Sequence, residues 1–238
     1  MKFISLLVIA TLSLINISCE TTGSNSDGKV ESYKKASATG SKTLSKSITV
    51  TGTFDGKNIR YRAGSKLGDG SQKEGQKPLF ILRPGATLKN VIIDKSGADG
   101  VHVYASDGKT TKIINCEWWD VGEDAITVRS GDNDANVLIK DCYFAKAADK
   151  VIQINAKPIV LIENCYAIDF ERFCRANGTK GSPNHSYRVT IKNTKGKNGR
   201  SMLKMSNSKA RGWLEKITTE NVKELHQMSG GAKVSIKK

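Results

Sequence analysis

The hydrophobic and polar positions of this chain repeat at an interval of about 25 residues. From Ile48 onward, short β-branched runs alternate with Gly, Asn and Asp, a pattern typical of short strands. In one recurring phrase, apolar and polar residues alternate until an Asn or Asp closes the run. The alternation predicts a strand with one buried face, and the closing residue favours a corner. The corner residues are Asn90, Asn115, Asp141, Asn164, Asn193 and Asn221.

A second register with the same period indicates which side chains face the core. One inward position is shared by Val101, Ile126, Ile152 and Cys174. The outward position beside it is shared by His102, Thr127, Gln153 and Arg175. Two registers with one period predict an all-β, single-domain solenoid, a parallel β-helix with about three short strands per coil. We expect residues 43–238 to form this solenoid, with the corner Asn residues bonded to one another in a ladder.

Four charged residues recur at one place in the repeat, namely Asp99, Asp124, Lys150 and Arg172. Parallel strands stack about 4.8 Å apart, so these side chains are expected in one row on a wall of the solenoid. Two acids and two bases then lie side by side. Each residue alone is also explained as an ordinary turn or surface residue. Their joint stacking makes the row our candidate active site.

The first residues are typical of an export signal. A short basic start at Met1-Lys2 precedes the apolar run 3–10, and Ser18 and Cys19 close the segment. We predict a signal peptide at residues 1–19. Cys19 also resembles the lipid-carrying cysteine of bacterial lipoproteins, so free secretion and lipid anchoring at the cell surface both stay open. Residues 20–42 show no apolar period and are predicted to be a flexible tether before the catalytic domain.

The formal net charge of +15 on 238 residues narrows the choice of partner. Lys and Arg are spread along the whole chain, and such a charge favours nucleic acid or an acidic polysaccharide. Export argues against nucleic acid, so an acidic polysaccharide is the predicted partner. A solvated basic surface without any ligand is the alternative. We expect the protein to be a monomer.

The cysteines follow from the same repeat. Cys116, Cys142 and Cys165 share one stacked position, and Cys174 lies in a core column. We predict that they are small buried side chains. Disulfides between neighbouring coils are the alternative in an exported chain, because stacked Cα atoms lie within bridging range. Their spacing and inward direction argue against a zinc site.

The charged row suits the cleavage of an acidic sugar polymer. Asp99 and Asp124 are close enough to share one metal ion, with Glu123 beside them, and oxygen ligands without histidine favour calcium. The ion and an arginine would hold a substrate carboxylate and acidify the proton on the adjacent ring carbon. Lys150 can remove that proton only as a neutral amine. We expect the two arginines one coil away to lower its pKa.

Five linked motifs, at residues 85–93, 98–102, 118–125, 149–153 and 170–175, resemble the small pectate lyases of polysaccharide lyase family 3. The resemblance implies a right-handed parallel β-helix that cleaves de-esterified polygalacturonate by calcium-dependent β-elimination, giving unsaturated oligogalacturonides. It implies calcium ligands at Asp99, Glu123 and Asp124. It implies catalytic, substrate-binding bases at Lys150, Arg172 and Arg175.

Some positions depart from that family or stay open. Arg83 stands where family members commonly have an acid, and Arg172 where they usually have lysine, which changes the geometry of the charge. His102 points outward beside Asp99 and is either a substrate contact or a spectator.

Two other functions also stay open. One is a glycoside hydrolase of the pectin-cleaving type that uses paired carboxylates, and the other is a non-catalytic module that holds acidic polymer at the cell surface.

Overall fold

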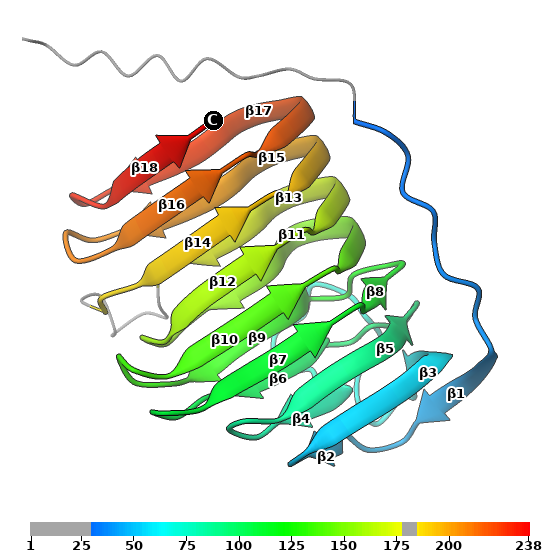
Figure 1. Ribbon diagram of the computed structural model, residues 1–238. Coiled ribbons are helices and arrows are strands. Elements are labelled where there is room, and N and C mark those ends of the chain that lie inside the picture. The colour runs from blue at the N-terminus through cyan, green and yellow to red at the C-terminus, as the bar shows by residue number, and fades with distance from the viewer. Residues whose placement is uncertain (1–29, 178–184) are drawn as a thin grey trace, which may run out of the picture.

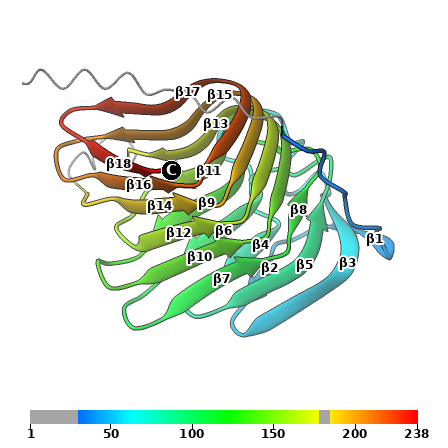
Figure 2. The same ribbon diagram turned by 45° about the horizontal axis from the view of Figure 1, so that its top comes forward.

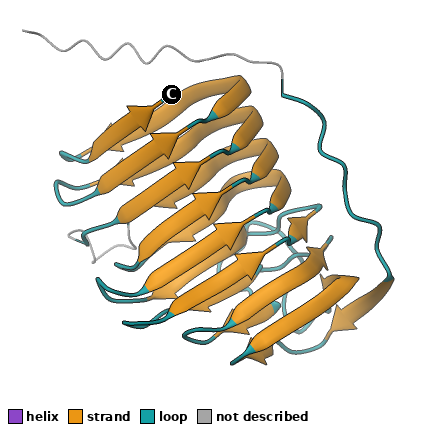
Figure 3. Ribbon diagram, viewed as in Figure 1, coloured by secondary structure: helices purple, strands orange, loops and turns teal. Residues whose placement is uncertain are grey.

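The computed structural model describes residues 30–177 and 185–238. Within them the chain winds into a stack of coils made only of strands and loops (Figures 1 and 3). The strands pair in parallel from one coil to the next. The prediction of a parallel β-helix is therefore confirmed. The proposed signal peptide at 1–19, its Cys19 and residues 20–29 lie outside the described residues.

In the described residues, eighteen strands form one continuous sheet that closes around the core. The first nine are β1 (Gly40–Leu44), β2 (Ile48–Val50), β3 (Thr53–Ala63), β4 (Phe80–Leu82), β5 (Thr87–Ile93), β6 (Val101–Tyr104), β7 (Thr110–Ile114), β8 (Glu117–Trp118) and β9 (Asp124–Ser130). The others are β10 (Asn136–Lys140), β11 (Tyr143–Ile154), β12 (Ile159–Glu163), β13 (Tyr166–Ala176), β14 (Arg188–Lys192), β15 (Lys195–Ser206), β16 (Arg211–Glu215), β17 (Thr218–Ser229) and β18 (Lys233–Lys237). No helix that is long and apolar enough to cross a membrane occurs in this part of the chain.

Each coil contains three strand segments, as expected, but two of them fuse in the later coils. The strands β6, β7 and β8 are separate, whereas β11 pairs with both β8 and β9. The long strands β11, β13, β15 and β17 therefore turn a corner without ending (Figure 2). A residue with positive φ stands at each of these bends, namely Lys146, Asp169, Asn198 and Asn221.

Small aliphatic and aromatic side chains fill the narrow interior. The predicted inward residues Val101, Ile126, Ile152 and Cys174 pair in register and are fully buried. Aromatic rings continue the stack between coils, with the Trp118 and Phe144 ring centroids 4.9 Å apart. The four cysteines of the described residues are buried and free, so the prediction of unbridged thiols is confirmed there.

The corner ladder exists, with one error in its predicted membership. Asn90, Asn115, Asp141, Asn164 and Asn193 all have φ near +50°, which Asn and Asp tolerate better than other side chains. The amide of Asn115 donates to Asn90 Oδ1 at 2.7 Å, and the amide of Asn164 donates to Asp141 Oδ1 at 2.5 Å. These bonds tie neighbouring coils together at the corner.

The prediction that Asn221 belongs to this ladder is wrong. It belongs to the second column, at the bend of the long strands, where its amide donates to Asn198 Oδ1 at 3.2 Å. Asn198 in turn donates to Asp169 Oδ1 at 3.0 Å. In that coil the corner position of the first column holds Lys216, which has φ of 51°. The local phrases of the two columns are alike, so the sequence pattern alone did not separate them.

Residues 30–39 form a strap that lies along the coils from β17 to β1 (Figures 1 and 2). The Val30 amide donates to Glu220 Oε2 at 2.8 Å, and the Tyr33 ring stacks on Tyr143 with centroids 4.4 Å apart. After the strap, β1 pairs with β3. From residue 30 onward, the segment expected to be a flexible tether is therefore packed on the solenoid, and the first strand begins at Gly40 instead of residue 43.

Candidate active site

The charged row lies on the wall formed by β9, β11 and β13. Asp124 pairs in register with Lys150, and Lys150 with Arg172. The outward positions Thr127, Gln153 and Arg175 stack beside this row. The parallel register therefore brings together side chains that lie about 25 residues apart in sequence.

A pocket of about 250 Å³ opens on this wall. Four carboxyl groups and three basic side chains line it together. Its lining consists of Glu74, Asp99, Glu123, Asp124, Thr127, Arg129, Lys150, Gln153, Asn155 and Arg175. The structure thus gathers five of the predicted site residues and adds Glu74 and Arg129. Arg172 and His102 do not line the pocket.

Gly100 permits the close approach of the first two acids. A Cβ at Gly100 would lie 2.2 Å from the backbone carbonyl oxygen of Ala125 and 2.4 Å from that of Asp124, and φ of Gly100 is +47°. Only glycine fits such a contact at low cost. The turn at Gly100 therefore places Asp99 against the strand that carries Asp124.

The acids of the pocket repel one another. Burial raises the pKa of Glu123 to about 8, and the charges of Asp99, Glu74 and Asp124 add to the rise. Burial also raises the pKa of Asp124 to about 7; Lys150 acts in the opposite direction, and Asp99 adds to the rise. The pocket therefore holds protons at pH values where isolated carboxyl groups are ionised.

The donor set fits calcium by its chemistry. The pocket offers carboxylate oxygens and no sulfur or imidazole, which suits a hard cation. Glu123 Oε2 is buried without a hydrogen-bond partner, and such an atom is costly unless something binds it. As they are positioned, no three Asp, Glu, His or Cys side chains of the described residues converge on one point as a metal-ligand cluster. Binding a cation here would therefore draw the repelling carboxylates together.

Lys150 is clamped between two carboxylates. Its Nζ lies 2.5 Å from Asp149 Oδ2 and 3.4 Å from Asp124 Oδ1. Burial acts to lower the pKa of Lys150, but the charges of Asp124 and Asp149 together raise it above its ordinary value. The expectation that the arginines would lower this pKa is therefore wrong for the protein without a bound ion. The two acids, 3.4 and 2.5 Å from the amine, outweigh the effect of burial.

The two arginines differ in their partners. Arg172 is tied down, because its Nη1 donates to Asp149 Oδ1 at 2.8 Å and its Nη2 lies 3.3 Å from Glu171 Oε1. Arg175 takes part in no ion pair among the described residues, and its Nε is buried without a hydrogen-bond partner. Arg175 is thus a cation of the pocket that is free to receive an anion, as is Arg129, which has no ion pair with a described residue either.

His102 and Arg83 lie outside this cluster. His102 Nε2 is hydrogen-bonded to Asp99 Oδ2 at 2.7 Å, and both side chains are buried. In this position His102 orients Asp99. Arg83 is exposed, and its guanidinium lies 5.4 Å from the centroid of the Tyr104 ring.

Sequence reasoning missed Asp149 and Glu74. Asp149 had a signal, because an acid directly precedes the row residue in three successive coils, at Glu123, Asp149 and Glu171. Glu74 had none, because it lies in the non-repeating loop between β3 and β4. That loop is fastened to the wall by Gln72, whose Nε2 donates to the Gly122 oxygen at 2.7 Å.

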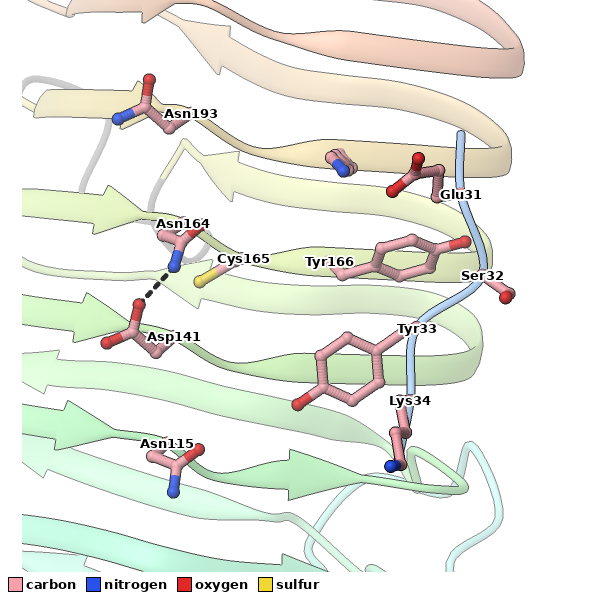
Figure 4. Close-up of a pocket in the computed structure, with 11 residues that line it drawn as sticks. Glu31, Ser32, Tyr33, Lys34, Asn115, Asp141, Asn164, Cys165, Tyr166 and Asn193 are labelled. Atoms are coloured by element: carbon pink, nitrogen blue, oxygen red, sulfur yellow. Dashed lines mark hydrogen bonds between the residues drawn. The ribbon is translucent and has the colours of Figure 1, made fainter. Parts of the chain in front are cut away.

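Another pocket, of about 320 Å³, lies between the strap and the corner ladder (Figure 4). It shares no lining residue with the charged pocket. Tyr33 and Tyr166 lie on one side of it, and Asp141 and Asn164 on the other. Asn115, Asp141 and Asn164 of its lining take part in the corner ladder, so we assign it a structural role.

Comparisons with known proteins show the family of the chain. Residues 32–234 match the pectate lyase family. Pectate lyase E of Emericella nidulans is 36% identical over 150 residues, which cover 63% of this chain and 57% of that relative. Probable pectate lyase E of Neosartorya fischeri is 36% identical over 177 residues, covering 74% of this chain and 66% of that relative. The chain thus matches less than two thirds of the length of these curated relatives. It belongs to the pectate lyase family.

Proposed function

We propose that the protein is a calcium-dependent pectate lyase that cleaves de-esterified polygalacturonate to unsaturated oligogalacturonides. One observation carries the proposal: a single pocket combines four carboxylates, Lys150 and the unpaired Arg175. Family membership supports the same activity. Asp99, Glu123 and Asp124 would hold the calcium ion, with Glu74 beside them.

In this proposal Arg175 and Lys150 have different roles. Arg175 binds the carboxylate of one uronate ring and withdraws charge from it. Bound calcium would supply further positive charge to that carboxylate, and Asp124, which would help to hold the ion, is also one of the two acids beside Lys150. The Lys150 amine removes the proton from ring carbon 5. The released electron pair forms the double bond between carbons 4 and 5, the bond from carbon 4 to the glycosidic oxygen breaks, and that oxygen takes up a proton.

Arg172 and Asp149 support this chemistry by position. Arg172 is held by Asp149, so it contributes positive charge beside the pocket, and Asp149 fixes the Lys150 amine through its other oxygen. The pKa of Lys150 lies above its ordinary value. The neutral fraction of the amine therefore increases with pH, and we expect elimination to be fastest under alkaline conditions.

The test is incubation of the purified protein with polygalacturonate and calcium while ultraviolet absorbance is followed. Elimination gives an unsaturated uronate that absorbs in the ultraviolet, whereas hydrolysis gives only a new reducing end. We expect Lys150→Ala to reduce the rate by about 10²–10⁴-fold, with Lys233→Ala as a matched control on the exposed last strand. Unaltered cleavage by Lys150→Ala would exclude Lys150 as the base.

The same assay separates the two rival functions. Reducing ends without ultraviolet absorbance would identify a hydrolase. Binding of polygalacturonate without any cleavage, with calcium present, would identify a binding module. The lyase is favoured because a pair of carboxylates acting alone would leave Lys150 and Arg175 without a role at the pocket.

We further propose that the protein acts outside the cell, as a monomer, either secreted or anchored through Cys19. The support is the sequence pattern of residues 1–19. Expression of the full chain and of Cys19→Ala in a bacterial host tests the anchor. A lipid mass on the mature protein that disappears in Cys19→Ala would establish anchoring, and its absence from the unaltered protein would leave free secretion.

A further inference from the structure

A pocket of about 400 Å³ adjoins the candidate active site. The two share Arg129 and Asn155, so their walls are continuous. Ser130, the last residue of β9, also lines this adjoining pocket, and further lining residues come from two turns: Gly131 with Asp132, which follow β9, and Ala156 with Lys157, which follow β11. His185 completes the lining.

The strand geometry places the adjoining pocket in line with the catalytic row. Asp124, Thr127 and Arg129 all face the candidate active site from β9. The backbone N–H of Asn155 donates to the backbone oxygen of Val128 at 3.0 Å, so Asn155 lies beside Arg129 on the next coil. At about 3.3 Å per residue, Arg129 lies roughly 16 Å along the strand from Asp124. That distance exceeds one sugar ring, so the adjoining pocket serves a different ring of the same polymer.

The charges in the adjoining pocket favour an anion. No ion pair between described residues involves Arg129 or Lys157. The Lys157 amide donates to the Gly131 oxygen at 3.1 Å, which fixes the two turns against each other while the side-chain amine stays unpaired. Asp132 is the only acidic residue among the described residues of the lining. Two unpaired cations, Arg129 near the end of β9 and Lys157 on the fastened turn beside it, suit a carboxylate.

We propose that Arg129 and Lys157 form a further subsite, which binds the carboxylate of a uronate ring separated along the chain from the ring that reacts. The proposal rests on the proposed function, because it takes the acidic polymer as the ligand. It implies that the bound polymer runs along the strands across this wall. Arg129 stands at the junction and contacts the chain as it leaves the catalytic pocket.

The test compares a long and a short substrate in the full-length protein. Arg129→Ala and Lys157→Ala are assayed on polygalacturonate and on trigalacturonate, which cannot fill both pockets. We expect the ratio of KM for the polymer to KM for the trimer to rise about fivefold in each variant, since each loses a charge-assisted hydrogen bond. Lys233→Ala removes the same charge from the last strand and should leave this ratio unchanged.

An unchanged ratio of the two KM values, whether neither KM changes or both change equally, would overturn the subsite. Calorimetric binding of hexagalacturonate separates this failure from failure of the proposed function. If the unaltered protein binds but releases no unsaturated product, the lyase proposal fails, and weaker binding by Arg129→Ala and Lys157→Ala still supports the subsite. If both variants bind hexagalacturonate as tightly as the unaltered protein, the subsite is excluded whatever the products are.

Discussion

Glu117 holds the strap on the solenoid, and its replacement by glutamine should loosen the strap. The carboxylate is 3% exposed. Its Oε1 accepts hydrogen bonds from the Tyr33 hydroxyl at 3.1 Å and from the Ala36 amide at 2.8 Å. Its Oε2 accepts one from the Trp119 indole at 2.5 Å. Glutamine has nearly the same shape but one acceptor oxygen, so in either orientation its NH₂ group faces a donor.

The expected loss of stability follows from these contacts. At least one hydrogen bond to a buried charged group disappears, which typically costs about 1.5–3 kcal/mol, and the donor left behind is unsatisfied. We therefore expect Glu117→Gln to lower the free energy of unfolding by about 2–3 kcal/mol. For a domain of this size, that corresponds to a fall in Tm of roughly 5–10 °C.

Urea unfolding followed by tryptophan fluorescence measures this loss. Glu163→Gln is a matched control, because Glu163 makes ion pairs with Lys140 at 3.3 Å and Lys192 at 3.9 Å at the surface. Such pairs contribute about 0–1 kcal/mol. Limited trypsin digestion should also cleave the strap of Glu117→Gln faster, at Lys34 and Lys35. If Glu117→Gln cost no more than the control, the buried carboxylate would not be what holds the strap.

Three further outcomes are expected. Asp149→Asn removes an acid that raises the pKa of Lys150. The part of the pH–rate profile in which the rate rises with pH should therefore shift to lower pH, and an unshifted profile would contradict the role of Asp149 beside Lys150. Calcium should raise Tm more at pH 8 than at pH 6, because Glu123 and Asp124, with pKa values of about 8 and 7, must lose protons to bind it; an equal rise in a thermal scan would contradict this. Asn164→Ala should cost about 1–2 kcal/mol in urea unfolding, since it loses a ladder bond and keeps a φ of 53°; a stability unchanged from the native chain would count against the ladder.

The sequence predicts most of the fold because the core imposes a period on it. A parallel solenoid needs an apolar residue at every inward position of every coil, and Val101, Ile126 and Ile152 satisfy that need in register. The same register made the row from Asp124 to Arg172 predictable. Asn221 was misplaced because the phrase around it resembles the corner phrase of the other column.

What the sequence did not predict lies outside the period. The loop that carries Glu74 and the strap that carries Tyr33 each occur once, so no repeat indicates where they pack. The direction of the Lys150 pKa shift depended on which charges lie nearest, and distances of a few ångströms decide that sign. Asp149 was visible in the sequence, but its role became clear only when its two oxygens were found on Lys150 and Arg172.

The chain as a whole is basic, whereas its pocket gathers four carboxyl groups among the basic side chains, and the proposed function needs both features. A net charge of +15 attracts a polyanion from a distance but repels calcium. Gathering Asp99, Glu123, Asp124 and Glu74 in one pocket concentrates oxygen donors there, and in the proposed function these donors would bind a divalent cation inside a basic protein. Arg175 stands unpaired at the edge of that acidic spot. In the proposed function, a substrate carboxylate would therefore meet the cation and Arg175 together, and the elimination would start from that arrangement.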